Sequence, residues 1–129
     1  MIQSKIAETI SAWVESALGL PFTVFCDLIP DENADGACIR HDPTPAAEKR
    51  FTDGTRQVSW NFTFYIRCKD SALARECGKK IVDKLDGATI ESAGLKIDCE
   101  AVTLPQFIDM DAKGFTTYSA SVKCTYSEE

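Results

Sequence analysis

A strict alternation of side chains over Gln57–Cys68 constrains this chain more than any other feature of its sequence. A period of two is the repeat of a β-strand, whose successive side chains point to opposite faces. One face of this strand is therefore expected to cover a core while the other stays polar, as in an antiparallel sheet. The apolar positions are Val58, Trp60, Phe62, Phe64, Ile66 and Cys68, and the intervening positions are Ser59, Asn61, Thr63, Tyr65 and Arg67.

Two other segments repeat their apolar residues every three or four positions, which is the spacing of an amphipathic helix. The first helix is expected to end where Gly19 offers a left-handed cap and Pro21 prevents continuation. Asp70 or Ser71 can cap the start of the second, and Gly87 marks its end. The apolar stripes are Ile2, Ile6, Ile10, Trp13, Val14 and Ala17 in the first helix, and Leu73, Cys77, Ile81 and Leu85 in the second.

Four further segments, 22–28, 37–41, 95–101 and 116–126, have strand-like composition. The turn-rich segment 30–36 separates the first two, so a hairpin is expected there. The order α-β-β-β-α-β-β predicts an α+β fold, with a mostly antiparallel sheet of about five strands and both helices packed on one face. A chain of 129 residues is expected to form a single domain over 1–129.

Composition excludes several classes of protein. Hydrophobic residues make up 44% and charged residues 26%, which is typical of globular proteins and not of disordered ones. No apolar run approaches the roughly 18 residues of a membrane span, and Glu8 and Glu15 interrupt any secretory signal. A net charge of -6 argues against general electrostatic binding to nucleic acid. We therefore expect an intracellular protein without membrane association.

The six cysteines are spread along the chain without a CxxC pair, which argues against the short knuckle of a structural zinc site. Nothing indicates secretion, and free cysteine is among the most buried residue types. We therefore expect reduced thiols in the core.

Signatures of catalysis are missing from the sequence: there is no Gly-rich phosphate loop, nucleophile elbow or HExxH motif. Asp42 could orient His41, the only histidine, but no third catalytic element can be placed. We therefore expect no enzymatic activity and no cofactor.

Residues 31–42, DENADGACIRHD, resemble a calcium loop because oxygen ligands recur at alternate positions before Gly36. The last position is Asp instead of Glu, and the flanks favour strands. Acidic turns produce this pattern by chance, because Asp, Asn and Gly are turn residues. We therefore expect no metal site, and the candidate ligands of a cation-binding loop are Asp31, Asn33, Asp35 and Asp42.

The segment 42–56 lacks periodicity and contains Pro43, Pro45 and Asp53-Gly54, so a long loop is expected. Loops above about 12 residues in compact domains are usually functional or disordered. An aromatic residue among charged ones suits an interface anchor. The alternative is that Phe51 folds back onto the sheet and the charges are solvated.

Charge is unevenly distributed along the chain. Residues 67–84 hold six basic and three acidic side chains, whereas 86–129 hold eight acidic and three basic ones. Such runs are commonly solvated faces. Alternatively, surfaces of opposite sign on one subunit can meet head to tail and close into a ring.

Several landmarks follow one another along the chain with a particular spacing. They are Leu20-Pro21, Leu28-Ile29-Pro30, the acidic turn ending in Gly36, the Pro43-x-Pro45 pair, and Phe51-Thr52-Asp53-Gly54 before the long strand. In this order they resemble the minor capsid or tail-terminator proteins of long-tailed phages and prophages, from the first helix to the last strand. The expected order of helices and strands agrees with the fold that this resemblance implies.

The resemblance implies a structural role without catalysis. The family forms a homo-oligomer, a hexameric ring that caps the tail tube, stops its polymerisation and offers a surface for joining the DNA-filled head. The implied partners are the tail-tube protein and the head-connector protein, and DNA passes the channel without specific binding. The implied location is the virion, at the tail and neck, after assembly in the bacterial host cytoplasm. The residues expected at the tube contact are Lys49, Arg50, Phe51, Asp53 and Arg56.

Three alternatives stay open at this level. A head-completion or neck adaptor protein would share the ring geometry but contact the portal side. A small cation-binding module would use the acidic residues of the 31–42 loop. The isolated protein can also be a monomer that assembles only on the tube.

Overall fold

The fold is built on one long antiparallel strand pair. The computed structural model describes residues 2–30, 34–42, 48–50, 56–92 and 95–128. In it, β4 (Arg56–Cys68) pairs with β8 (Thr116–Glu128) from Arg56↔Glu128 to Cys68↔Thr116. The expected alternation of β4 is confirmed, because Phe62, Phe64, Ile66 and Cys68 are fully buried on one face.

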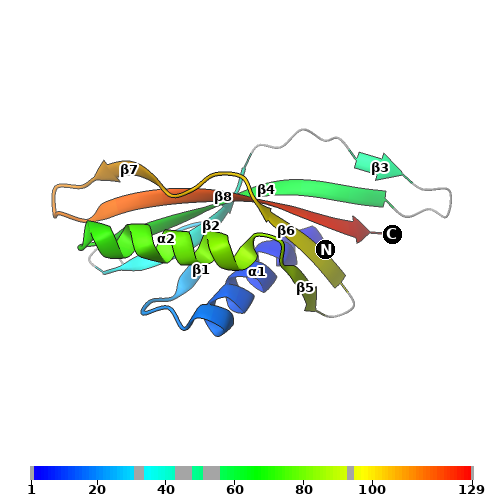
Figure 1. Ribbon diagram of the computed structural model, residues 1–129, viewed down its shortest axis with the longest axis horizontal. Helices are drawn as coiled ribbons and strands as arrows, with labels where there is room; N and C mark the ends of the chain where they lie inside the picture. Colours follow the sequence, from blue (N-terminus) through cyan, green and yellow to red (C-terminus); the bar gives the residue numbers. More distant parts are fainter. Residues whose placement is uncertain (1, 31–33, 43–47, 51–55, 93–94, 129) are drawn as a thin grey trace.

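The other strands lie on both sides of this pair, and Figure 1 shows their arrangement. The sheet has the order β1-β2-β4-β8-β6-β5; β3 also pairs with β4, and β7 also pairs with β8. The short strands are β1 (Val24–Cys26), β2 (Gly36–His41), β3 (Glu48–Arg50), β5 (Thr89–Ser92), β6 (Leu95–Ala101) and β7 (Gln106–Met110).

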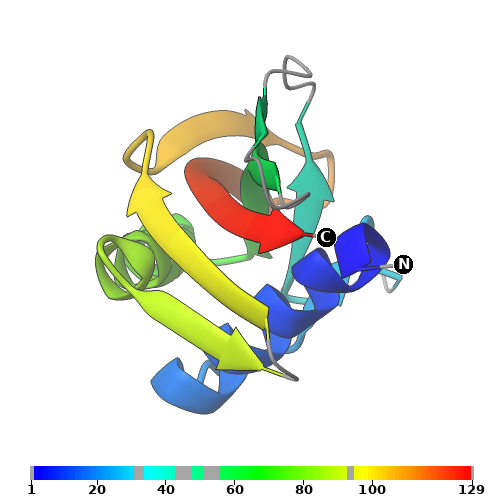
Figure 2. The same cartoon turned by 90° about the vertical axis from the view of Figure 1, so that its right-hand side faces the viewer.

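Both expected helices are present, α1 (Ile2–Leu18) and α2 (Ser71–Leu85). The N-cap of α2 is Asp70, whose carboxylate accepts a hydrogen bond from the backbone N–H of Ala72 at 3.0 Å. After α1 the chain passes through Gly19 with a φ of +57°, the left-handed conformation that favours glycine. Along the sheet, Figure 2 shows a curl rather than a flat surface, with α1 lying inside the curve.

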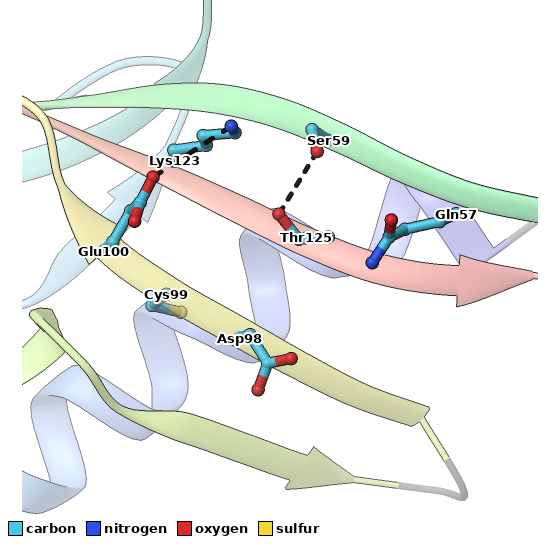
Figure 3. Close-up of a pocket in the computed structure, with 7 residues that line it drawn as sticks. All are labelled: Gln57, Ser59, Asp98, Cys99, Glu100, Lys123 and Thr125. Atoms are coloured by element: carbon cyan, nitrogen blue, oxygen red, sulfur yellow. Dashed lines mark hydrogen bonds and ion pairs between the residues drawn. The ribbon is translucent and has the colours of Figure 1, made fainter. Parts of the chain in front are cut away.

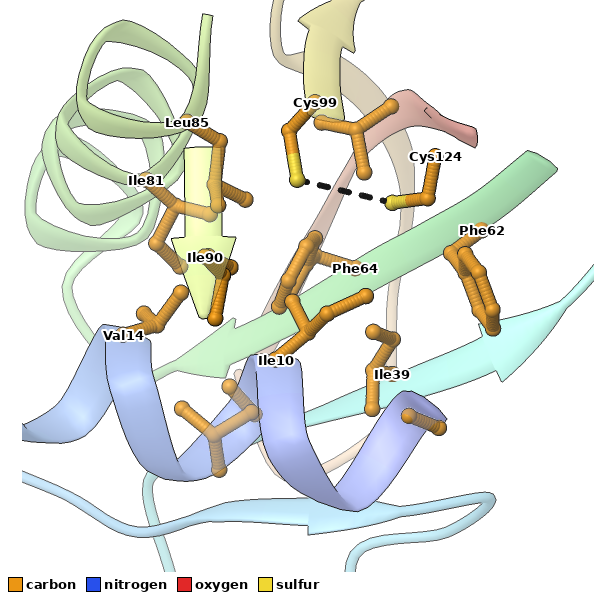
Figure 4. Packing of buried hydrophobic residues seen from close by; sticks show 14 of the residues in the cluster. Ile10, Val14, Ile39, Phe62, Phe64, Ile81, Leu85, Ile90, Cys99 and Cys124 are labelled. Carbon is orange, nitrogen blue, oxygen red and sulfur yellow. Dashed lines mark hydrogen bonds between the residues drawn. The ribbon is translucent and has the colours of Figure 1, made fainter. Parts of the chain in front are cut away.

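The helices and the apolar face of the sheet enclose one core. In Figure 4, Ile10 and Val14 of α1 and Ile81 and Leu85 of α2 converge on Phe64. Burying a side chain of this size is worth about 1.5–3 kcal/mol, so the core supplies much of the driving force for folding. The α+β class and the helices packed on the sheet's apolar face are therefore confirmed.

The cysteines mostly lie in this core. Cys38, Cys68, Cys77, Cys99 and Cys124 are buried, Cys26 is half-buried, and all six are free thiols. The sulfur atoms of Cys99 and Cys124, directly opposite each other on β6 and β8, are 3.7 Å apart.

The predicted hairpin between 22–28 and 37–41 is wrong, because β1 and β2 are parallel, with Val24 opposite Ala37. The chain turns at once after β1, where Asp27 has a φ of +72° and its backbone N–H bonds to the carbonyl of Ile39 at 2.9 Å. It then returns so that β2 starts beside the beginning of β1. Ile29 packs against Gly36, where an added Cβ would lie 2.9 Å from it.

Three short strands were not expected. The segment 42–56 was predicted to be a loop throughout, but β3 pairs with β4 through Glu48↔Val58, Lys49↔Gln57 and Arg50↔Arg56. The strands β5 and β7 were missed as well. Three to five residues are too few to show a period, so partners supplied by tertiary structure define these strands.

Candidate assembly surface

The clearest surface feature is a run of exposed apolar side chains on β7 and just before it. We define the β7 surface as five residues that are 46–63% exposed. They are five of the six large exposed hydrophobics among the described residues, the sixth being Leu28. Contiguous exposed apolar side chains mark sites of interaction, whereas scattered ones need no explanation. The β7 surface consists of Val102, Leu104, Phe107, Ile108 and Met110.

One edge of β7 is paired and the other is open. Gln106 lies opposite Ser119 and Met110 opposite Thr116 on β8, with a bulge at Ile108. Among the described strands β7 has no second neighbour. An edge with unpaired backbone groups and apolar side chains is a template for pairing with another chain. The geometry therefore suits addition of a strand.

The backbone before β7 is held against the body of the protein. The backbone N–H groups of Val102 and Thr103 both donate to the carbonyl of Ser121, at 2.9 and 3.2 Å. Pro105 lies over Gly78 of α2, where an added Cβ would be 3.2 Å from the proline Cγ. The exposed strand is thus carried by a fixed segment rather than by a free loop.

The turn between β7 and β8 is also fixed. The carboxylate of Asp111 accepts backbone hydrogen bonds from Lys113 and Phe115, both at 2.9 Å, and these bonds lower the pKa of Asp111. Within this turn Gly114 has a φ of +88°, the left-handed conformation that favours glycine. Phe115 is buried beneath the charged ends of Arg67 and Lys69, 5.5 and 5.4 Å from its ring centroid.

Charges of opposite sign lie near the β7 surface. Asp109 and Asp111 are exposed at the end of β7. The neighbouring helix α2 exposes four basic side chains, and one of them, Lys79, pairs with Asp83 at 2.6 Å. The basic stretch noted in the sequence is therefore largely the outer face of α2. Its exposed basic residues are Arg75, Lys79, Lys80 and Lys84.

A polar groove of about 360 Å³ lies over β4, β8 and β6 (Figure 3). Its side chains bond across the strands: Ser59 to Thr125 at 3.2 Å, and Lys123 to Glu100 at 4.0 Å. No nucleophile–base pair occurs among the lining residues. The groove is lined by Gln57, Ser59, Asp98, Cys99, Glu100, Lys123 and Thr125.

The residues predicted from the sequence to contact the tube lie at one end of the β4–β8 pair. Lys49 and Arg50 are in β3, and Arg56 begins β4 directly opposite Arg50. Phe51 and Asp53 lie outside the described residues. The structure thus brings three of the five together in one arm, formed by β3 and the start of β4.

The candidate cation loop is not a loop in the structure, because β2 occupies its second half. Asp35 precedes β2 and accepts a hydrogen bond from the backbone of Lys69, whereas Asp42 follows β2 and accepts one from Thr63. Six extended residues separate the two carboxylates by about 20 Å, so they cannot share an ion. Asp31 and Asn33 lie outside the described residues, and the described part of the chain contains no cluster of metal-ligating side chains.

Sequence reasoning missed the β7 surface. Five apolar residues fall within Val102–Met110, which is a usable signal, but Pro105 and the bulge at Ile108 break the period of two. Nothing in that stretch shows whether its side chains are buried. The side chains of β7 are exposed because the helices cover the apolar face of the central strands and not β7.

The comparisons with known proteins agree with this picture of a structural subunit. A family model described as "Bacteriophage tail terminator protein" matches residues 5–128. The chain belongs to this family. A tail terminator is a structural component of the phage virion, and the resemblance seen in the sequence is confirmed.

The comparison with solved structures supports the fold and says nothing more about function. One solved structure aligns with this tail terminator with a TM-score of 0.57 and 15% identity, covering 99% of this chain and 94% of the other. No curated protein matches the chain. Among the described residues, no helix has both the length and the apolar character needed to cross a membrane.

Proposed function

We propose that this tail terminator acts as one subunit of a ring that caps the tail tube, stops its growth and provides the surface to which the head is joined. The observation that carries the proposal is the family match over residues 5–128. The ring acts by shape: once it occupies the last tube ring, no further tube subunit can add. Its other face is then free for the head connector.

Two features of the subunit support assembly into a ring. The β7 surface exposes apolar side chains at an open strand edge. The charges are segregated, with basic residues on α2 and acidic residues on the strands that follow it. A subunit with different surfaces at its two ends makes heterologous contacts, and these close into a ring when the rotation permits. Six subunits are the number implied by the resemblance.

A central channel must let DNA pass. The net charge of -6 favours a lumen that repels phosphate, so that DNA moves through without adhering. Specific binding of DNA is not part of the proposed function.

The tube contact is assigned to the arm at the end of the β4–β8 pair, which extends beyond the helices in Figure 1. Its charged residues Lys49, Arg50 and Arg56 lie on paired strands, and Phe51 and Asp53 belong to the segment between them. Replacing Arg50 and Phe51 together with alanine should weaken capping, whereas Lys96→Ala on β6, at an exposed position outside the arm, should not. Tails of normal length that join heads in the double variant would remove this assignment.

The ring-cap proposal is tested by deleting the gene and measuring tails by electron microscopy. Loss of the cap should give tails of uncontrolled length that carry no heads, and the wild-type gene supplied in trans should restore both. Tails of normal length without heads would instead identify a neck adaptor. Purified protein added to growing tubes should stop their elongation, with tube protein alone as the control.

A further inference from the structure

The exposed edges of β3 and β7 are related in a way that suits contact between copies. β3 runs antiparallel to β4, β7 runs antiparallel to β8, and β4 and β8 are antiparallel to each other. It follows that β3 and β7 run in opposite directions within one subunit. Two copies in similar orientation would therefore present β3 of one and β7 of the next as antiparallel partners, without turning either copy over.

The two edges also lie at opposite ends of the subunit. β3 pairs with β4 at Arg56–Val58, whereas β7 pairs with β8 near Thr116, at the far end of the long pair (Figure 1). Thirteen extended residues give that pair a length of about 43 Å. Neither strand has a second partner among the described strands. The open edges also face opposite ways across the sheet, because β3 lies on the outer side of β4 and β7 on the outer side of β8. A copy displaced both along this axis and across the strands would therefore bring its β3 beside the neighbour's β7.

The residue types on the two strands are complementary. β3 has the sequence Glu48-Lys49-Arg50, and β7 combines exposed Phe107, Ile108 and Met110 with exposed Asp109. Lysine and arginine can cover apolar surface with their aliphatic stems while their charged ends reach a carboxylate. Pairing of β7 with β7 of another copy would instead bring acidic residues of like charge together. Charge thus favours the unlike pair.

From these observations we infer that β3 of one copy adds to the open edge of β7 of the next, forming a continuous intersubunit sheet around the ring. The inference rests on the proposed function and assigns the contact that holds its ring together. Lys49, in the middle of β3, then serves this contact between copies, and the tube contact falls to the rest of the arm. The contact is heterologous, because each copy uses a different strand at each end.

Charge reversal tests the inference. Asp109→Lys and Lys49→Glu should each raise the protein concentration needed for half-assembly about tenfold, the effect of losing roughly 1.4 kcal/mol per contact. The double variant should recover most of the loss, because the pair is restored with its signs exchanged. The matched controls are Glu8→Lys on α1 and Lys96→Glu on β6, both exposed in the wild type and expected to assemble normally. Sedimentation velocity, with the protein alone and with tail tubes, measures assembly, and circular dichroism confirms that each variant folds.

Crosslinking gives a second readout on assembled rings. A carbodiimide joins a lysine amine to a carboxylate with loss of water. In rings made from mixed ¹⁴N and ¹⁵N protein, a Lys49–Asp109 peptide of mixed isotopes is expected. The inference is overturned if the wild type caps tubes while both reversals behave like their controls, or if mixed-isotope crosslinks exclude this pair. A wild type that never associates with tubes would contradict the proposed function itself.

Discussion

The two sides of β8 show how differently strands of one sheet can be used. β4 pairs along the whole of β8, and its apolar residues, such as Phe62 and Phe64, are fully buried beneath the helices. β7 pairs with the same strand, yet Phe107 on it is 53% exposed. Both strands are hydrogen-bonded to β8, so the difference in exposure lies in what covers the side chains. β4 therefore stabilises the fold, whereas β7 leaves its apolar side chains exposed for the proposed contact between copies.

The largest effect is expected from truncating matched aromatic residues on the two strands. Phe64→Ala should lower the free energy of unfolding by about 3–5 kcal/mol, because it leaves a cavity in the core. Phe107→Ala should lower it by less than about 1 kcal/mol and weaken assembly instead. Urea denaturation measures the first effect, and sedimentation of the folded variant measures the second. Similar losses of stability for both variants would remove the distinction between the strands.

A smaller effect on stability is expected where the segment before β7 packs against α2. Gly78→Val on α2 would crowd Pro105 and should cost about 1–3 kcal/mol through overpacking. Lys80→Val, at an exposed position of the same helix, is the control for the intrinsic cost of valine in a helix. The difference between their unfolding free energies measures how tightly Pro105 and Ile66 enclose Gly78. Equal losses would mean that these two neighbours make room freely.

The reactivity of cysteine thiols should distinguish the buried face of the sheet from the exposed β7 surface. Burial raises the pKa of Cys68 to about 12, and hydrogen bonding to Cys99 together with burial raises that of Cys124. In the native protein at pH 8 both should react with an alkylating reagent far more slowly than a cysteine introduced by Met110→Cys on β7. Mass spectrometry of alkylated peptides over time gives the rates. Rapid labelling of Cys68 in folded protein would show that its face of the sheet is open.

The raised pKa of the buried Cys68 thiol should also make the protein less stable at alkaline pH. The unfolded chain releases the Cys68 proton near pH 9, whereas the folded chain retains it to about pH 12. Between these values the native state binds more protons, so stability falls as pH rises. Below pH 9 this contribution is fully present. Cys68→Ala should flatten the decline in melting temperature between pH 9 and 11, although it lowers stability at pH 7.

The smallest effect concerns the turn that ends β7. Backbone hydrogen bonds lower the pKa of Asp111, so its contribution is present above its unfolded pKa and is lost as pH falls through the folded value. Asp111→Ala should cause a small loss of stability at pH 7 that disappears at acidic pH. Asp111→Asn keeps an oxygen acceptor and should retain stability without this pH dependence. Thermal unfolding at pH 7 and pH 3 distinguishes them, and an unchanged Asp111→Ala variant would show that Gly114 alone sets the turn.

Much of the fold was predictable because its signals are periodic and long. The alternation over Gln57–Cys68 predicted the central strand and its buried face, and the stripe through Cys77 and Ile81 predicted α2. The pairing of β1 with β2 was predicted in the wrong direction. Turn residues near Gly36 indicate that the chain bends, but the left-handed Asp27 and the return past Ile29 decide where β2 begins.

The candidate site was predicted only in part, for a related reason. The sequence singled out Lys49 and Arg50 by their charge and setting, and the structure adds that they form a strand edge. The sequence did not single out Phe107 or Met110, because an apolar residue looks the same in a sequence whether it is buried or exposed. Exposure depends on which elements lie above it, and here α1 and α2 cover β4 but leave β7 open.

Local patterns in the sequence were enough to predict the two helices, the long central strands, the burial of most cysteines and the resemblance to phage tail terminators. These features follow from residue types and their spacing over short segments, so they can be predicted without knowing which segments pack together. Tertiary structure alone decided the parallel β1–β2 pair, the short strands β3 and β7, and the apolar edge left open at β7. Strand pairing and burial are contacts between distant segments, so the whole chain must pack before they are defined.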